Sequence, residues 1–426
     1  MKTRLWLLLS LLASATMWFY MHRVLLPWEQ FVNVSKGPVI AAMGDLYPRW
    51  VGTREYWLHG RNPYSPGVSH EIQMAYYGHP IVQSYDKPPA DILDEQRFAY
   101  PVYLVFLLAP VTHVDFPTLQ NFAPFLLGLG VAASILLWLD ILHWRPPWPI
   151  TAAICLFVLS SPQIVQGLRL RQLALLVGFL LALGAWCLSR NYFLSAGVVF
   201  AVSTIKPQMV ILPLTCVAIW SIGDWRRRWR VLTGMGGTLV ALVLAGEWIV
   251  PGWIGDFFQG MDAYRHYVPL ASILRIFLGP ITGTALSVIF VLLLIFFMWR
   301  NRKEQWTSAR VLMIFSAFFL AAVLTLPLLS PLNQVMLVLP LLMVLRDWTS
   351  PSNSTLTRLA RFVFVLSVSW PMIVSAVLLL FRPRTDSLSR LPLLPWFMVF
   401  VVPFVLLLLL ATRGSIAIPT GVTDHE

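Results

Sequence analysis

Asp45 is the acidic residue whose surroundings most favour chemistry. It directly precedes Leu46, Trp50, Thr53 and Trp57, which recur at intervals of three and four residues. That spacing places them on one face of a helix. A carboxylate at this point can cap the helix N-terminus, or it can take a proton from a substrate as a general base. The two roles do not exclude each other, and the pattern leaves both open.

The residues around this stripe support a helix. Pro48 falls in the first turn, where proline is tolerated, Gly60 can end the helix, and Asn62-Pro63 starts a turn. Tryptophan on the stripe suits a helix that lies at a membrane surface. We therefore expect an interfacial helix that begins after Asp45 and ends at Gly60.

The composition defines the class of protein that must position these residues. Of 426 residues, 58% are hydrophobic and 12% are charged, and the mean hydropathy is +0.72. Soluble domains carry about 25% charged residues. These values exclude a soluble enzyme, a disordered chain and a disulfide scaffold. The net charge of +12 indicates arginines at membrane faces, with an anionic lipid ligand as a further reading, rather than nucleic acid.

Apolar runs predict an all-α polytopic membrane protein with about 12 transmembrane helices (range 10–13). The first span is uncleaved and lies within residues 1–27. The others are expected near 118–142, 149–167, 172–188, 192–205, 207–222, 231–250, 281–299, 310–329, 331–346, 362–381 and 393–411. The segment 98–114 contains Pro101 and Pro110 and is too short for a full crossing, so we expect it to be re-entrant or interfacial.

Arginine-rich loops set the sidedness, because cytoplasmic loops are rich in Lys and Arg. The loops Asp224–Arg230 and Arg300–Arg310 are the strongest signals, and they place both chain ends in the cytoplasm. The long polar segment 28–97 then lies on the outer face, where we expect it to carry function. We divide the chain into a first span (1–27), an outer loop with interfacial helices and the candidate base (28–97), a transmembrane module (98–345), and a C-terminal pair of spans with a short cytoplasmic tail (346–426).

Several short motifs occur in an order that resembles glycosyltransferase family 87. Asp45 followed by Gly60-Arg61-Asn62-Pro63-Tyr64 resembles the first outer loop of that family. The later matches are Tyr100-Pro101 with the apolar run to Pro110, Ser161-Pro162 through Gln172, Ile205-Lys206-Pro207-Gln208, and Ser330-Pro331. The chain departs from the family pattern at Val102, Arg171 and Ala174, which puts the substrate in doubt more than the fold.

The resemblance implies a C-type glycosyltransferase fold and an inverting transfer from a polyprenyl-phosphate sugar. The acceptor would be a glycolipid or glycan, and mannose is the default hexose. Asp45 matches the position of the general base. The implied place is the outer or periplasmic face of the cell membrane, within the lipid bilayer.

The leaving lipid phosphate needs cations at the outer face. Lys206, Arg169, Arg171 and His266 are the candidates for donor phosphate binding. Each of these residues also has a simpler interpretation without a role in binding. Lys206 can be a lysine that reaches from the end of a span to the membrane surface. Arg169 and Arg171 can be boundary residues, and His266 can be an exposed residue. The candidates for substrate binding are Arg49, Arg54, Glu55, Tyr64 and Gln172.

No cofactor, metal or nucleic acid is expected. His59, His70 and His79 have no standard ligand spacing, and Cys155, Cys187 and Cys216 lie in apolar runs. A transporter or flippase of lipid-linked saccharide is the main alternative, but transporters often show internal repeats and ionisable groups at the membrane midplane. No such repeat is apparent. A non-catalytic scaffold is a third reading, and the oligomeric state stays open.

Overall fold

The computed structural model describes residues 2–35, 43–81, 95–264, 271–326, 331–348, 354–381 and 390–414. Within these ranges the chain forms helices joined by turns, and no strand occurs among them. The first helices are α1 (Lys2–Tyr20), η1 (Met21–Leu25), α2 (Leu26–Ser35), α3 (Leu46–His59), α4 (Pro66–Tyr77), α5 (Leu104–Leu108) and η3 (Ala109–Val111). Next come α6 (Phe116–Ile141), α7 (Trp148–Leu159), α8 (Pro162–Arg169), α9 (Ala174–Ser189), α10 (Phe193–Ser203), α11 (Pro207–Ile222) and α12 (Trp225–Ile249). The last are α13 (Trp253–Tyr264), α14 (Ile273–Leu278), α15 (Pro280–Asn301), α16 (Ala309–Thr325), η4 (Pro331–Leu337), α17 (Val338–Arg346), α18 (Thr355–Phe381), η5 (Leu391–Phe400) and α19 (Val402–Gly414).

Six of the described helical stretches are long and apolar enough to cross a membrane: Arg4–Phe31, Phe116–Ile141, Trp225–Ile249, Pro280–Asn301, Thr355–Phe381 and Leu391–Thr412. The helices α7 and α8 pass the same test together, but they bend by 64°, so they make a seventh span only as one broken helix. Five shorter apolar helices have 10–17 residues: Ala174–Ser189, Phe193–Ser203, Pro207–Ile222, Ala309–Thr325 and Pro331–Arg346.

Each of the predicted spans therefore coincides with an apolar helical stretch. The shorter ones fall below the thickness of a bilayer core, because 16 residues of helix measure about 24 Å against roughly 30 Å of hydrocarbon. The multi-pass character is supported, whereas twelve crossings stay a prediction. The first helical stretch also continues to Ser35, past its predicted end at residue 27.

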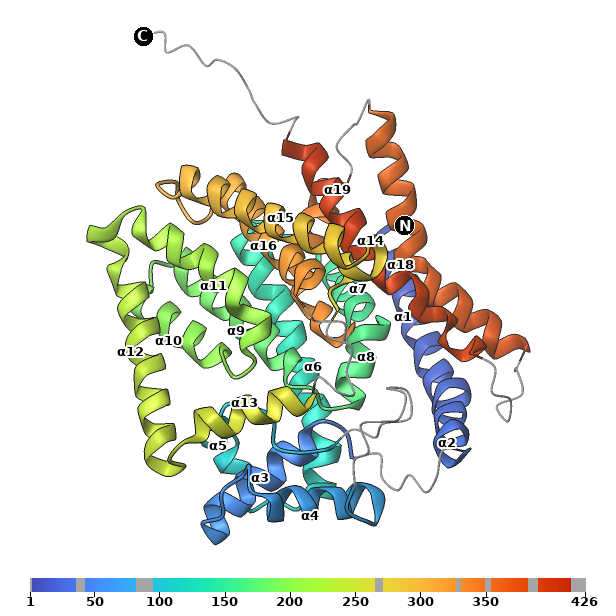
Figure 1. Ribbon diagram of the computed structural model, residues 1–426. Coiled ribbons are helices and arrows are strands. Elements are labelled where there is room, and N and C mark those ends of the chain that lie inside the picture. Colours follow the sequence, from blue (N-terminus) through green and yellow to red (C-terminus); the bar gives the residue numbers. More distant parts are fainter. Residues whose placement is uncertain are drawn as a thin grey trace.

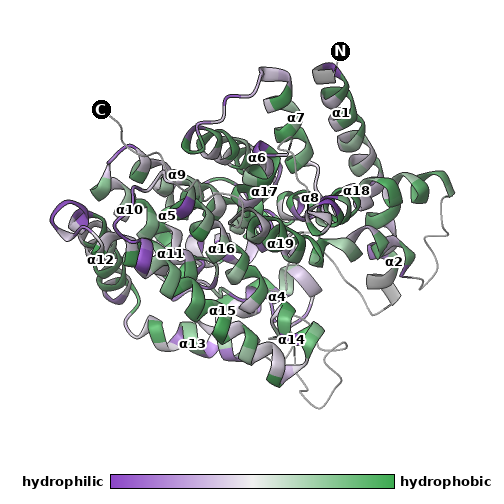
Figure 2. Cartoon of the chain, turned by 90° about the horizontal axis from the view of Figure 1, so that it is seen from above, coloured by the Kyte–Doolittle hydropathy of each residue, from purple (hydrophilic) through white to green (hydrophobic). Residues whose placement is uncertain are grey.

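Most of the helices consist of hydrophobic residues, as Figure 2 shows. Large hydrophobic side chains stand fully outside the core: Trp248 at the end of α12 is 86% exposed and Ile281 on α15 is 85% exposed. Water-facing surfaces rarely carry contiguous apolar area of this extent. The exposure is therefore that of a protein whose helices face lipid, as expected of a multi-pass membrane protein.

Two opposite ends of the molecule are distinguished by the elements that lie there (Figure 1). At one, which we call the Asp45 end, lie α3, α4, α5 and α13. At the other, the Arg228 end, lie the turn between α11 and α12 and the loop that follows α15. The helix α12 runs between the two, and its 25 residues measure about 37 Å.

Residues 98–114 contain only α5 and the turn η3, and five helical residues rise about 8 Å. This segment is therefore too short to cross as a helix. The helix α3 packs along it: the Trp50 indole N–H donates to the Val111 carbonyl at 3.1 Å, and that of Trp57 donates to Val105 at 3.0 Å. The predicted helix and its C-terminal Gly60 are confirmed, with Gly60 at φ 66°. Its tryptophan stripe faces the protein's own chain.

A glycine contact fixes α10 against α12. A Cβ on Gly197 would overlap the carbonyl oxygen of Val231, so only glycine lets the two backbones approach this closely. The packing matters for the site because the turn that ends α10 carries Lys206.

Candidate functional site at the Asp45 end

A close backbone approach holds Asp45 at the start of α3. Gly44 has φ 69°, and a Cβ there would lie 2.8 Å from the carbonyl oxygen of Leu170, so this position requires glycine. The Asp45 N–H donates to the same oxygen at 2.8 Å, and the Tyr76 hydroxyl donates to the Gly44 carbonyl. Within this described segment the Asp45 side chain makes no capping hydrogen bond. The capping role is therefore wrong for the side chain, although the residue occupies the cap position.

The Asp45 carboxylate is instead held by Gln172, which follows α8. The Gln172 side-chain amide donates to Asp45 Oδ2. Its carbonyl Oε1 accepts from the Tyr100 hydroxyl at 3.1 Å, which fixes the amide with its N–H groups toward the carboxylate. Both Gln172 and Tyr100 are buried. A chain of two hydrogen bonds thus orients one oxygen of Asp45.

Arg49 adds a positive charge one turn after Asp45 on the same helix. Its guanidinium carbon lies 4.8 Å from the centre of the Tyr100 ring, within the range of a cation–π contact. The Thr53 hydroxyl donates to the Arg49 carbonyl at 2.7 Å, which supports this turn of α3. Arg49 therefore belongs to the same cluster as Asp45, Tyr100 and Gln172.

Lys206 lies in the turn between α10 and α11 and is only 7% exposed. Burial lowers the pKa of its ammonium to about 8, and the nearby Arg49 charge acts in the same direction, whereas Asp45 raises it. Among the described residues the ammonium has no hydrogen-bond or ion-pair partner. Buried lysines are rare unless they are paired, so a buried ammonium without a partner is a candidate group for binding an anion.

Tyr103 fixes the turn that carries Lys206. Its hydroxyl lies 2.9 Å from both the carbonyl oxygen and the side-chain Oγ1 of Thr204. The segment that carries Tyr100 is thereby tied to the turn between α10 and α11. Segments that are far apart in the sequence thus bring a carboxylate, a guanidinium and a buried ammonium together, which suits removal of a proton beside a developing negative charge.

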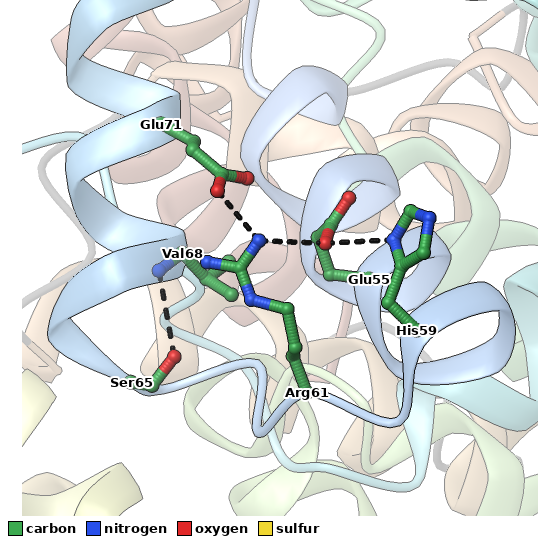
Figure 3. Close-up of polar contacts among 6 residues, drawn as sticks. All are labelled: Glu55, His59, Arg61, Ser65, Val68 and Glu71. Atoms are coloured by element: carbon green, nitrogen blue, oxygen red, sulfur yellow. Dashed lines mark hydrogen bonds and ion pairs between the residues drawn. The ribbon is translucent and has the colours of Figure 1, made fainter.

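The structure does not bring Arg54 and Glu55 to this cluster. Glu55 lies ten residues after Asp45 on α3, about 15 Å along the helix. Figure 3 shows its carboxylate between Arg61 and His59, each 2.9 Å away, while Arg61 also contacts Glu71 at 2.5 Å.

The exposed Arg54 places its guanidinium 5.1 Å from the Trp50 ring. The ion pairs of Arg61 with Glu55 and Glu71 link α3 to α4 near the turn between them.

Tyr64 supports the cluster from outside. Its backbone N–H donates to Asn62 Oδ1 at 2.9 Å, which forms the expected turn, and its hydroxyl donates to the Tyr100 carbonyl at 2.5 Å. Asn62 in turn donates to Asp256 of α13 at 3.1 Å. Tyr64 therefore contacts the cluster through the backbone of Tyr100.

The other basic candidates lie near the cluster with partners of their own. Arg169 forms an ion pair with Glu29 of α2, at 2.5 and 3.2 Å. Arg171 has φ 52°, and its Nε donates to the Gln120 carbonyl at 3.2 Å. Its pKa is lowered by burial and by the charge of Arg169. His266 lies outside the described residues, so its role stays a prediction.

Sequence reasoning missed the parts played by Tyr100 and Glu29. Tyr100 belongs to the Tyr100-Pro101 motif, but a tyrosine before a proline gives no sign that its hydroxyl reaches Gln172. The signal for Glu29 was a carboxylate directly after the first apolar run. Among the described residues no group of three or more His, Cys, Asp and Glu side chains is placed to hold a metal.

The helices define a multi-pass membrane protein with a partly buried cluster of Asp45, Arg49, Tyr100, Gln172 and Lys206 at one end. A model of glycosyltransferase family 87 matches residues 98–331, more than half of the chain. The chain therefore belongs to glycosyltransferase family 87, as the resemblance in its motifs implied, and is a membrane glycosyltransferase. The matched region includes Tyr100, Gln172 and Lys206 and begins after Asp45. No curated protein and no solved structure matches the chain.

Proposed function

We propose that this protein transfers a hexose, with mannose as the default, from a polyprenyl-phosphate donor to a glycolipid or glycan acceptor, with inversion at the anomeric carbon. The observation that carries the proposal is the meeting of Asp45 and Lys206. The carboxylate acts on the pKa of an ammonium that is buried and has no other partner among the described residues. We assign the helices to the C-type glycosyltransferase fold.

The reaction follows from the charges of the cluster. Asp45 takes the proton of the acceptor hydroxyl, and the acceptor oxygen attacks C1 of the sugar from the face opposite the phosphate. The bond between C1 and the phosphate oxygen breaks, and its electron pair leaves with the polyprenyl phosphate. That phosphate gains a negative charge, which the Lys206 ammonium stabilises. Gln172 and Tyr100 hold the base in place, so its orientation is set before the substrate binds.

Further cations assist at the donor phosphate in this proposal. Arg49 lies beside Tyr100 in the cluster, and Arg171 follows α8 next to Gln172. Arg169 joins them if the donor phosphate replaces Glu29 as its ion-pair partner, and His266 remains a candidate. Arg54, Glu55 and Tyr64, which lie near the turn between α3 and α4, are assigned to the acceptor side in this proposal.

The proposed location is the outer face of the cell membrane. The two arginine-rich loops lie at the Arg228 end (Figure 1). The positive-inside rule therefore directs that end to the cytoplasm and the Asp45 end outward. Polyprenyl-phosphate sugars and their acceptors would then meet at the outer surface of the bilayer.

The test is a transfer assay with purified protein in lipid vesicles. Polyprenyl-phosphate-mannose is offered with a panel of glycolipid acceptors, and the wild type is compared with Asp45→Asn. The substitution keeps the shape and removes the base, so the rate should fall by about 100- to 10,000-fold. Sugar found inside the vesicles without a new glycosidic bond would indicate transport.

Asp115→Asn is the matched control. Asp115 caps α6 by accepting from the Thr118 N–H at 2.9 Å, so it is an aspartate at a helix start with no contact to the cluster. Its variant should transfer at the wild-type rate. Equal rates for Asp45→Asn and the wild type would refute Asp45 as the base.

A further inference from the structure

The Arg228 end contains a polar cavity of about 180 Å³. It lies between the turn that links α9 to α10, the end of α11, the start of α12 and the loop after α15. Its lining residues are Leu188, Ser189, Asn191, Phe193, Trp220, Arg227, Arg228, Gln305, Trp306 and Thr307. None of them is acidic. A water molecule occupies about 30 Å³ of liquid, so the cavity has room for a phosphate group.

The walls of this cavity are rigid because Arg228 binds them together. Its guanidinium donates to the carbonyls of Trp220 and Arg302, at 3.0 and 2.7 Å, and to that of Glu304 at 2.9 Å. It also lies 3.8 Å from the centre of the Trp220 ring, and the Trp220 indole N–H donates to the Glu304 carbonyl at 3.0 Å. The cavity is thus preorganised before any ligand enters.

Several hydrogen-bond donors line the cavity. Trp306 is 3% exposed, and within the described part of the chain its indole nitrogen has no hydrogen-bond partner. Arg227 donates to Asn191 Oδ1 at 3.3 Å, which leaves the Asn191 amide N–H groups as donors. An indole N–H, an amide and a guanidinium together favour a ligand that accepts hydrogen bonds.

The charge around the cavity selects an anion. Arg226 and Arg230 flank the two lining arginines on α12. The Glu304 carboxylate is engaged by Arg310 and Ser308, at 2.5 and 2.8 Å. Asp224 acts on Arg228 but does not line the cavity. Charge-assisted bonds to phosphate are the strongest that such donors form.

The position of the cavity indicates where the phosphate comes from. Trp225 and Trp229, on the first turns of α12, are 57% and 41% exposed, and tryptophan exposed at the end of an apolar span marks the membrane surface. Figure 2 shows hydrophilic stretches beside α12 among otherwise hydrophobic helices. We propose that this cavity binds the phosphate group of an anionic phospholipid, at the opposite end of α12 from the sugar-transfer site.

Lipid binding to the full-length protein tests this proposal. The protein in neutral detergent is titrated with phosphatidylglycerol, with phosphatidylcholine and with inorganic phosphate at matched ionic strength, and thermal unfolding is followed by circular dichroism. Phosphatidylglycerol should raise Tm with a saturable dependence, because a ligand of the folded state stabilises it. Phosphatidylcholine should produce less than half of that shift.

Three variants locate the effect. Arg227→Gln and Trp306→Phe each remove donors from the cavity and should weaken phosphatidylglycerol binding about tenfold. Arg226→Gln makes the same charge change outside the lining and should weaken it less than twofold. Arg227 is exposed, so its variant should fold, and Trp306→Phe keeps an aromatic ring against Trp220.

Competition by inorganic phosphate and the losses in the variants distinguish the possible ligands of the cavity. Inorganic phosphate that leaves phosphatidylglycerol binding intact supports a lipid headgroup, whereas inorganic phosphate that competes supports the same phosphate site filled from solution. Equal losses in Arg226→Gln and Arg227→Gln would show diffuse surface attraction and overturn the site. Absence of any saturable Tm shift from either phosphate source would overturn it as well.

Discussion

The Asp45 end and the Arg228 end each bury a basic side chain, but the two side chains differ in their hydrogen-bond partners. The guanidinium of Arg228 donates to three backbone carbonyls and stacks on Trp220. The ammonium of Lys206 has no such partner among the described residues, and burial lowers its pKa to about 8. A fixed guanidinium links the elements of a junction, whereas an uncompensated ammonium suits the proposed binding of an anionic substrate.

The neighbours of the two cations explain this difference. The end of α11 and the loop after α15 present backbone carbonyl oxygens to Arg228, and the fork of its guanidinium donates to three of them at once. The turn before α11 carries Lys206, and the carboxylate that acts on it, Asp45 at the start of α3, is itself held by Gln172. The Lys206 ammonium is therefore not compensated by a hydrogen bond or ion pair among the described residues, at some cost in stability.

Lys206→Met is the largest test of this comparison. It removes the proposed phosphate contact, so transfer should fall by about 100- to 1,000-fold, the effect of deleting one donor to a developing anion. The free energy of unfolding should stay unchanged or rise, because a buried ammonium without a partner is replaced by an apolar chain of similar length. Transfer rates and thermal unfolding measure the two effects.

Arg228→Met provides the opposite case. It strips a donor from three buried carbonyls, and the free energy of unfolding should fall by about 3 kcal/mol. If Lys206→Met were destabilised as strongly, Lys206 would be a structural residue and the contrast between the two ends would disappear. Lys206→Arg keeps the charge and serves as the control for transfer.

A further prediction concerns how the rate of sugar transfer depends on pH. The pKa of Lys206 is lowered from 10.5 to about 8, so its charged form is present below pH 8 and is lost above it. The kcat/KM for the donor should be level below pH 8 and should fall about tenfold per pH unit above it, because this parameter reports the free enzyme. Lys206→Arg should abolish this descending limb.

The same lowered pKa has the reverse effect on stability. Between about pH 8 and 10.5 the unfolded chain holds a proton that the folded protein has released, so the contribution of Lys206 to stability rises with pH over this window. Activity and stability should therefore diverge above pH 8. A joint decline of both would mean that unfolding, rather than loss of the ammonium, stops transfer.

Much of the Asp45 end could be predicted from the sequence because its signals are local. The stripe after Asp45 gave the helix α3, Gly60 gave its end, and the motifs singled out Gln172 and Lys206. The electrostatic interaction between Lys206 and Asp45 follows only from the tertiary packing of the start of α3 and the turn after α10. Short motifs carry the residue types, and tertiary packing decides which of them meet.

The parts that sequence reasoning missed depend on that packing. Apolar runs mark membrane segments, but they do not show that the helix breaks between α7 and α8 with a 64° bend. The ion pair of Arg169 with Glu29 joins residues 140 positions apart, which no local pattern reports. The hydroxyl of Tyr100 is a third case, because its partner lies 72 positions away.

The smallest predicted effect tests whether Tyr100 acts through the base. Tyr100→Phe keeps the ring beneath Arg49 and the backbone carbonyl that Tyr64 contacts, but it removes the hydrogen bond to Gln172. The Gln172 amide can then turn away from Asp45. We expect kcat to fall about fivefold through poorer orientation of the base, and the free energy of unfolding to fall by about 1 kcal/mol.

A double-mutant cycle with Asp45→Asn decides how this loss arises. If Tyr100 only orients the carboxylate, Tyr100→Phe should change the residual transfer of Asp45→Asn by less than about twofold, while its effect on unfolding persists. A full fivefold loss in both backgrounds would place Tyr100 in direct contact with the substrate. The cycle thus distinguishes a residue that positions the proposed base from one that binds the sugar.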